Sequence, residues 1–235
     1  MTGEDKSQAV IPWTQLDKAP IPAGGELRLM KRGAEFSIKL GADELMNSRL
    51  SATEQALATM ACEKIRAVKR SRILIGGLGM GFTLRAALTV MGSEAAIVVA
   101  ELVPAVVAWA RGPMAKLFGN SLSDRRVRIE EGDVGDLIRS ADAAYDAILL
   151  DVDNGPEGMT RKANDRLYDL KGLRAAHAAL RRGGILAVWS SGPNPKFTIR
   201  LRKAGFEAAE VPLRAKGPRG GARHMIWIAR RQAHS

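Results

Sequence analysis

The chain has 235 residues, 46% of them hydrophobic and 26% charged, which suits one globular domain of ordinary size with a small appendage. Its opening stretch, MTGEDKSQAVIPWTQ, lacks the basic and apolar segments of a signal peptide, and no apolar run reaches the roughly 18 residues that span a bilayer. The single cysteine, Cys62, excludes an internal disulfide, and only three histidines are present. The composition therefore predicts a cytoplasmic protein without a metal ion or a membrane segment.

The net charge of +11 is concentrated in the C-terminal part of the chain. Residues 196–231 hold ten Lys or Arg against Glu207 and Glu210. Such a balance is typical of surfaces that bind nucleic acid, although the aromatic interleaving used for base stacking is missing. Two interpretations stay open: a patch that follows phosphates, and a solvated helix face with a basic loop.

The N-terminal part predicts little regular structure. Residues 1–25 contain three X-Pro steps and Gly24-Gly25, which indicates an irregular lead-in. The alternating stretch ELRLMKRGAEFSIKL, with Arg32-Gly33 at its centre, predicts a short β-hairpin. Ser51-Ala52-Thr53-Glu54 fits a capping box at the start of a helix. We expect residues 1–50 to form the lead-in and hairpin, and residues 51–235 to form the main domain.

The rest of the chain alternates strands and helices. Strands are expected at 72–76, 95–101, 127–131, 145–151 and 185–190, and helices near 80–91, 103–117, 134–140 and 164–182. Runs such as AAIVVAE and YDAILLD are almost wholly apolar, which indicates strands buried on both faces of a parallel sheet. Two further strands, at 206–211 and 223–229, would add an antiparallel pair. The pattern predicts an α/β fold with a mostly parallel, seven-stranded sheet.

The stretch ILIGGLGMGF joins the first of these strands to a helix. Gly77, Gly79 and Gly81 follow G-x-G-x-G, whereas the dinucleotide fingerprint would place its third glycine at Phe82. Without Cβ atoms the backbone can turn tightly and admit a ligand to the amides at the helix N-terminus. The turn therefore predicts a nucleotide or nucleoside site.

Three acids follow the next strands of the sheet. Glu101 ends the second strand, where a carboxylate can bind both ribose hydroxyls, and Asp133 follows the third, where an adenine amino group is commonly met. Asp151 ends the fourth, beside the reactive end of such a ligand. Each acid alone would also suit a helix cap. Because the carboxyl ends of parallel strands share one edge, together they predict a site for an adenosine-type ligand with a short tail.

These segments resemble those of a known family. ILIGGLGMGFTLRAAL, VVAELVPAVV, VRIEEGDV, YDAILLDVDNGPEG and ALRRGGILAVWS look like the core of the spermidine synthases, which are polyamine aminopropyltransferases. The resemblance covers roughly residues 70–230 and implies the Rossmann-like fold of class I methyltransferases. It implies S-adenosylmethionine or its decarboxylated form as co-substrate and an amine as acceptor. Because this fold family often dimerises, a homodimer is one of the oligomeric states that stay open. It also implies Glu101 on the ribose, Asp133 on the adenine, and Asp151 beside the transferred group.

The chain departs from the family pattern at three places. Met80 stands where the family carries an aspartate beside the cationic tail of the decarboxylated ligand. The family's Asp-x-x-Asp loop reads Asp151-Val152-Asp153-Asn154, so its second acid is an amide or has moved by one residue. The family's longer N-terminal β-domain, with its Tyr- and His-containing motif, is replaced by a hairpin and LMNSRLSATEQALA.

Three functions stay open. The first is transfer from an S-adenosyl ligand to an amine; because a free amine has a pKa near ~10, a base is useful, and Asp151 is expected in that role with Asp153 as a second acid. The second is an S-adenosylmethionine-dependent methyltransferase, acting on a small molecule or nucleic acid, in which Arg49 either pairs with the ligand carboxylate or with Glu54. The third is a non-catalytic nucleoside-binding protein.

Four further features carry weaker expectations. Trp189 is either a wall of the substrate pocket or a core residue, and Tyr168 either orients an amine or lies on a helix face. His224 is expected to be structural. The segment DNGPEGMTRKAND is either a gate above the site or an ordinary surface loop.

Overall fold

The structure is a computed structural model that describes residues 11–22, 24–152, 155–156, 165–216 and 220–232. Contacts divide the chain into two units, Met1–Arg49 and Leu50–Ser235, and each is described by itself. No helix among the described residues is long and apolar enough to cross a membrane.

The first unit is a four-stranded antiparallel sheet in the order β1-β2-β3-β4. Its strands are β1 (Thr14–Pro20), β2 (Glu26–Arg32), β3 (Glu35–Leu40) and β4 (Asp43–Asn47). The predicted hairpin is confirmed as β2 and β3, which turn at Gly33 with a φ of +58°. Strands β1 and β4 correct the prediction of a lone hairpin after an irregular lead-in. Only Ala19 of β1 is buried, so backbone pairing with β2 holds a strand that leaves no apolar pattern.

The second unit is an α/β domain whose seven-stranded sheet has the order β10-β11-β9-β8-β5-β6-β7. Its elements are α1 (Ala52–Ile65), β5 (Arg72–Gly76), α2 (Phe82–Val90), β6 (Ala96–Glu101), α3 (Pro104–Arg111), α4 (Ala115–Phe118), η1 (Ser121–Ser123), β7 (Val127–Glu131), α5 (Val134–Arg139), β8 (Tyr145–Leu150), α6 (Asp165–Tyr168), α7 (Leu170–Ala179), β9 (Leu180–Ser190), α8 (Pro195–Lys203), β10 (Phe206–Arg214) and β11 (Arg223–Arg231). Strands β5 to β9 pair in parallel, and β10 and β11 pair antiparallel. The predicted α/β sheet is confirmed.

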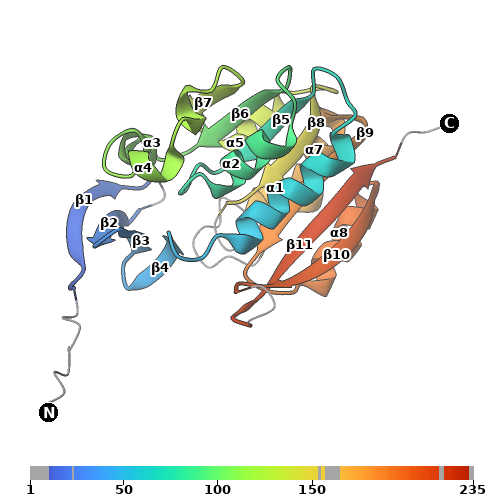
Figure 1. Cartoon of the computed structure of the whole chain (residues 1–235). Coiled ribbons are helices and arrows are strands. Elements are labelled where there is room, and N and C mark those ends of the chain that lie inside the picture. The colour runs from blue at the N-terminus through green and yellow to red at the C-terminus, as the bar shows by residue number, and fades with distance from the viewer. Residues whose placement is uncertain (1–10, 23, 153–154, 157–164, 217–219, 233–235) are drawn as a thin grey trace, which may run out of the picture. The chain divides into compact units, whose positions relative to one another are not determined.

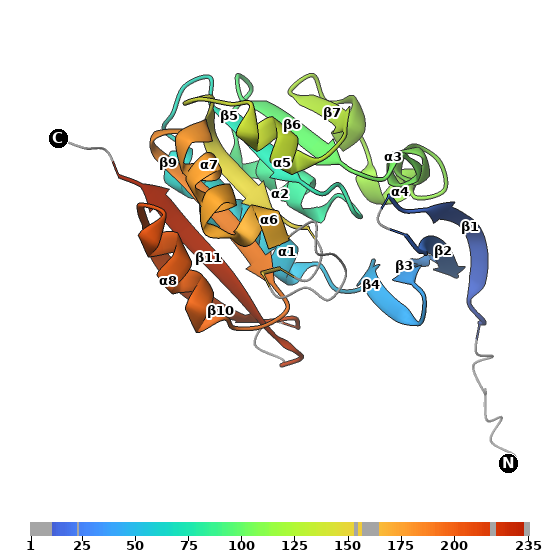
Figure 2. The same ribbon diagram turned by 180° about the vertical axis from the view of Figure 1, so that it is seen from behind.

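Helices cover both faces of this sheet. Helix α1 lies across β8, β9 and β11 in Figure 1 and packs against α2. Figure 2, from behind, shows α5, α7 and α8 on the opposite face. The core behind α7 and α8 is aromatic: the rings of Tyr168 and Trp227 each meet Phe197 edge-on, with centroids 5.8 and 4.9 Å apart.

Two predicted helices are shorter than expected. The helix predicted over 103–117 is divided into α3 and α4, because Gly112 and Pro113 follow α3 and proline cannot continue a helix. The one predicted over 164–182 is divided into α6 and α7 at Asp169, and it ends at Ala179 because Leu180 already belongs to β9. The predicted capping box is not formed either: Ser51 makes no side-chain bond to the backbone of α1 and instead accepts from Gln55 Nε2 at 2.9 Å.

The two edge strands of the sheet differ in length. Strand β7 is short and carries Arg128, Glu130 and Glu131. Strand β10 is longer and contains Pro212. The Ala215 N–H donates to Ala222 O just beyond the strand, and since hydrogen-bonded positions alternate, Pro212 has its nitrogen on the side away from β11. The ladder with β11 therefore loses no bond to the proline.

Candidate functional site

The predicted glycine turn connects β5 to α2. Gly77, Gly79 and Gly81 have φ angles of +89°, +49° and +75°, a region that side chains other than glycine rarely adopt. A Cβ at Gly77 would lie 2.5 Å from the backbone oxygen of Asp151, and one at Gly81 would lie 2.4 Å from the ring of Phe118. The chain's own close packing thus requires glycine at both positions.

Glu101 lies at the end of β6 and is tied to this turn. Its Oε2 accepts from the Leu78 N–H at 3.0 Å, inside the turn, and its Oε1 accepts from the Val103 N–H at 2.9 Å. Burial raises the pKa of this carboxyl, and the surrounding amides oppose that effect. The structure therefore brings Glu101 and the glycine turn together, as predicted.

Asp133 lies just after β7 and is partly exposed. Its Oδ1 accepts from the Gly135 N–H at 2.7 Å, so this side chain caps α5. The cap fixes where the carboxylate stands, and its contact with an adenine stays a prediction.

Asp151 follows β8 directly beside the turn. Its N–H donates to Gly76 O at 3.0 Å, and its Oδ2 accepts from the Thr83 hydroxyl at 2.6 Å. Burial, and then the charge of Glu54, raise the pKa of Asp151 to about 7, while the Thr83 bond lowers it. A carboxyl half protonated near neutral pH is suited to exchanging protons with a ligand.

Two other residues predicted for this loop cannot be placed. Asp153 and Asn154 lie outside the described residues, as does most of the segment expected as a gate. Asp153 therefore stays a predicted second acid. Arg49, in the first unit, forms ion pairs with Glu44 at 3.4 Å and Glu35 at 3.9 Å.

Sequence reasoning missed Glu54 and Thr83. Thr83 lies in the first turn of α2, and its hydroxyl is 2.6 Å from Asp151 Oδ2 and 3.4 Å from the Glu54 carbonyl oxygen. A Thr just after the glycine turn, in the first turn of the helix that follows it, is the signal that could have found it. Because Glu54 fits a capping box with Ser51, its position near Asp151 was not predicted.

Trp189 and His224 lie together beside the start of α1. Their rings meet edge-on with centroids 4.8 Å apart, and His224 Nδ1 is 2.9 Å from the Thr53 hydroxyl. Burial lowers the pKa of His224. Trp189 Nε1 is buried and has no hydrogen-bond partner among the described residues.

Tyr168 is a core residue. It is fully buried, and its hydroxyl donates to Val152 O at 3.4 Å, just after the end of β8.

Met80 and the first turn of α2 contribute no acidic side chain to the glycine turn. Met80 is only 3% exposed, so it presents an apolar, inward-facing side chain where the resemblance implies a carboxylate. Helix α2 has no side-chain cap and no acid in its first turn. Its N-terminal amides therefore offer a weakly positive surface that favours an anionic group.

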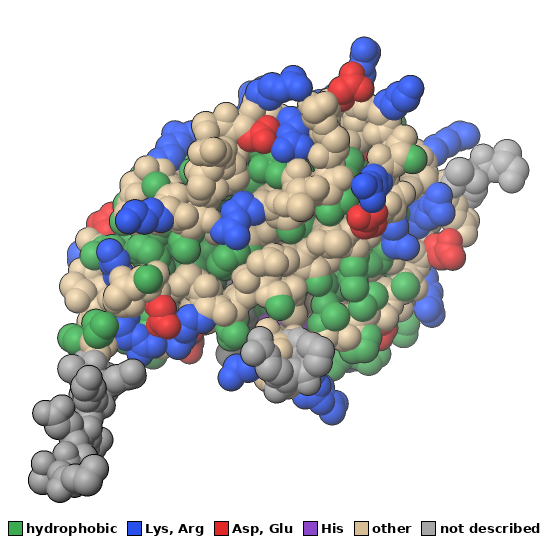
Figure 3. Space-filling model, viewed as in Figure 1, with side chains coloured by type: hydrophobic (Ala, Val, Ile, Leu, Met, Phe, Trp, Pro, Cys, Tyr) green, Lys and Arg blue, Asp and Glu red, His purple; other side chains and the backbone are tan. Residues whose placement is uncertain are grey.

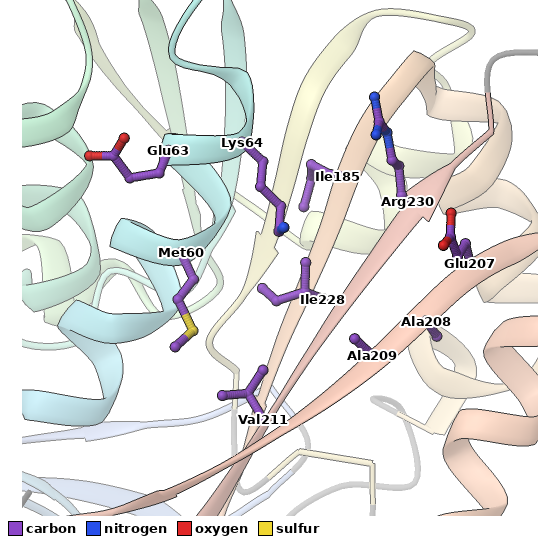
Figure 4. Close-up of a pocket in the computed structure, with 10 residues that line it drawn as sticks. All are labelled: Met60, Glu63, Lys64, Ile185, Glu207, Ala208, Ala209, Val211, Ile228 and Arg230. Carbon is purple, nitrogen blue, oxygen red and sulfur yellow. The ribbon is translucent and has the colours of Figure 1, made fainter.

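Other candidate sites lie apart from the turn. Among the described residues, no group of three or more His, Cys, Asp or Glu is placed to hold a metal ion. A groove of about 670 Å³ runs between α1 and strands β9 to β11, with Met60, Ile185 and Ile228 in its apolar lining and Lys64 and Arg230 also beside it (Figure 4). None of the predicted site residues lines this groove, so it is separate from the glycine turn.

Comparisons with known proteins agree with the fold. No protein-family model matches the sequence, and no match is found among curated proteins. The solved structures that are similar include three that match over 94% of this chain at 14% identity. They are a spermidine synthase in complex with the transition-state analogue AdoDATO (TM-score 0.72, 73% of its chain), the spermidine synthase from Thermotoga maritima (0.73, 74%) and a probable spermidine synthase from Corynebacterium glutamicum (0.64, 81%). The chain therefore has the methyltransferase-like α/β fold of the spermidine synthases, with a separate four-stranded antiparallel sheet.

Proposed function

We propose that this chain is a transferase of the spermidine synthase type, which binds an S-adenosyl ligand at the glycine turn and transfers a group to an amine. The similar fold supports an aminopropyltransferase-like activity, and one of the similar structures holds a transition-state analogue. The observation that carries the proposal is Asp151, a partly buried carboxyl at the end of β8, held by Thr83 beside the turn.

The elevated pKa of Asp151 suits it to deprotonate an amine. An alkyl ammonium has a pKa near ~10.4, so an ordinary aspartate is a very weak base toward it. With a pKa of about 7, Asp151 is better matched by roughly a thousandfold in equilibrium. Asp151 takes the proton as the N–H bond breaks; the freed nitrogen lone pair attacks the carbon next to the sulfonium, and the C–S electron pair returns to sulfur.

The residues around the turn fit an S-adenosyl ligand. In this proposal Glu101, fixed by the Leu78 and Val103 amides, holds the ribose hydroxyls, and Asp133 meets the adenine amino group. Gly77, Gly79 and Gly81 keep side chains out of the turn, so a ligand can approach the amides of α2. Asp153 is the proposed second acid of the loop after β8.

Calorimetry with S-adenosylmethionine, its decarboxylated form and methylthioadenosine tests the ligand. We expect at least one of them to bind the folded chain with a Kd of micromolar order, because the Leu78 and Val103 amides fix Glu101 at the turn and little ordering is needed on binding. If none binds at millimolar concentration, the nucleoside site does not exist. Binding without any transfer to an amine would overturn the proposed activity and leave a methyltransferase with another acceptor or a non-catalytic nucleoside-binding protein.

A methyltransferase is the second candidate, and Met80 favours it. A buried, apolar Met80 and the uncapped first turn of α2 offer nothing to the ammonium tail of the decarboxylated ligand. They suit the carboxylate of S-adenosylmethionine better, because helix N-terminal amides favour negative charge. A preference of tenfold or more for the carboxylated ligand in the same calorimetry would mark this function.

Two basic helices, α7 and α8, favour a polyanion as the substrate of this second candidate. Helices α7 and α8 lie side by side on one face of the sheet (Figure 2) and carry six Lys or Arg, two on α7 and four on α8, with no Asp or Glu. The opposite face is also rich in Lys and Arg (Figure 3). Within the basic stretch 196–231, Arg214 and Lys216 are exposed, and Arg219 lies outside the described residues.

Fluorescence anisotropy with a single-stranded RNA tests this surface. Because phosphate contacts release counterions, we expect binding at 50 mM salt to weaken steeply by 200 mM. Lys203→Glu should weaken it further by roughly threefold. Lys64→Glu, on α1 and the other face, should have a smaller effect. Equal effects of the two variants would show attraction by net charge alone and remove the nucleic-acid substrate.

A further inference from the structure

We propose that Glu54, in the first turn of α1, is the second acid of the transfer site and binds the acceptor's ammonium group together with Asp151. This inference rests on the function proposed above, and it concerns a residue from a different element than the loop that carries Asp151 and Asp153. Three structural observations support it: a hydroxyl between the two residues, a fixed carboxyl, and the absence of a cationic partner among the described residues.

The Thr83 hydroxyl shows that Glu54 and Asp151 are neighbours. It donates to Asp151 Oδ2 at 2.6 Å and lies 3.4 Å from the carbonyl oxygen of Glu54. Helices α1 and α2 pack directly against each other, so this arrangement belongs to the core of the domain. The start of α1 therefore lies beside the end of β8, with Thr83 in contact with both.

The Glu54 carboxyl is held in place by the chain. Its Oε2 accepts from the Thr53 hydroxyl at 3.0 Å, and that hydroxyl is also 2.9 Å from His224 Nδ1. A hydroxyl has one proton, so when Thr53 donates to Glu54, His224 Nδ1 donates to Thr53. The Trp189 ring packs against His224 and limits its movement. Glu54 is thus oriented from β11 and β9 instead of closing a capping box.

In the part of the chain that the structure describes, neither carboxyl has a cationic partner. Among the described residues, no Lys or Arg lies within ion-pair distance of either one. Burial raises the pKa of both groups, and the charge of Glu54 raises that of Asp151 further. Two nearby carboxyls repel each other when both are charged, and a cation from solution relieves that repulsion. A primary ammonium group, with three donors, can satisfy both.

This pair also accounts for one departure from the family pattern. The chain has Asn154 at the position of the second acid of the family's Asp-x-x-Asp loop. A cationic acceptor still needs negative charge at the site, because an ammonium group loses its hydration on binding. Glu54 supplies that charge from α1, and Thr83 positions Asp151 to take the proton.

The test is a pH titration of the side-chain carboxyls by ¹³C NMR on the full chain. The groups facing Asp151 are Glu54 on α1 and Thr83 on α2, with His224 reaching Glu54 through Thr53. Glu54→Gln removes the charge that raises the Asp151 pKa, so the midpoint should fall below about 7. Thr83→Val removes the bond that lowers it, so the midpoint should rise. Glu63→Gln, exposed on the same helix, should leave it unchanged.

Kinetics with 1,4-diaminobutane as the acceptor probe then separates the two proposals. In Glu54→Gln we expect the acidic limb of the pH–rate profile to move to lower pH and the KM for the amine to rise about tenfold. Transfer with an unmoved limb and midpoint would overturn the role of Glu54 alone. A lowered midpoint without transfer from any S-adenosyl ligand would overturn the acceptor role together with the proposed function.

Discussion

Replacing Asp151 with Asn is expected to lower the rate of group transfer by about 10²–10⁴-fold, the usual contribution of a positioned general base. Asn keeps the Thr83 hydrogen bond and nearly the same shape, so affinity for the S-adenosyl ligand should change only a few-fold. Single-turnover kinetics with saturating ligand, beside calorimetry of the same samples, measures both quantities. A variant that retains full transfer would show that Asp151 is not the base.

Thermal melting of Asp151→Asn shows whether a loss of activity comes from unfolding. The folded-state pKa of Asp151 is raised to about 7, so the folded state binds more protons than the unfolded one between about pH 4 and 7. This carboxyl therefore opposes folding increasingly as the pH rises through that range, and Asn does not. At pH 8 the variant should melt at the wild-type temperature or above it. Asp136→Asn, at an exposed position of α5, is the matched control and should alter neither activity nor melting.

Gly77→Ala is expected to destabilise the domain by about 2–4 kcal/mol and to abolish ligand binding. The φ of +89° disfavours any Cβ, and the new methyl group would stand 2.5 Å from the Asp151 backbone oxygen, so strand β8 or the turn must shift. Either movement displaces Asp151 relative to Thr83. Urea denaturation gives the loss of stability, and calorimetry gives the loss of binding.

Gly92→Ala provides the control for this substitution. Gly92 has no atom within 4 Å of a built Cβ, and its φ lies outside the left-handed region. We expect a change in the free energy of unfolding within about 0.5 kcal/mol and unchanged ligand binding. Equal effects at the two glycines would contradict the role given to the close approach at Gly77.

The parts of the fold that could be predicted are those marked by a local pattern of apolar residues, glycines or strand-end acids. The apolar strands, the glycine turn and the strand-end positions of Glu101 and Asp151 follow from patterns that lie within short windows. The N-terminal strands β1 and β4 do not, because few of their side chains are buried and backbone pairing alone marks them. The division of α3 from α4 could have been predicted from Pro113.

Glu54 shows why the candidate site was only partly predictable. Locally, its spacing from Ser51 matches a helix cap, and nothing in that window refers to Asp151 or His224. Its position beside Asp151 arises only when α1 packs on α2 and β11 lies next to β9. A rule that is correct for isolated helix ends was overridden by contacts between distant parts of the chain.

Pro212 has a consequence for self-association. An incoming strand that tried to extend the sheet at β10 would meet a missing amide donor in the middle of the outward-facing edge. At the opposite edge, β7 offers only a short strand with three charged side chains. Both edges of the sheet are thus protected against strand addition, and any homodimer of this domain must form through its helices or loops.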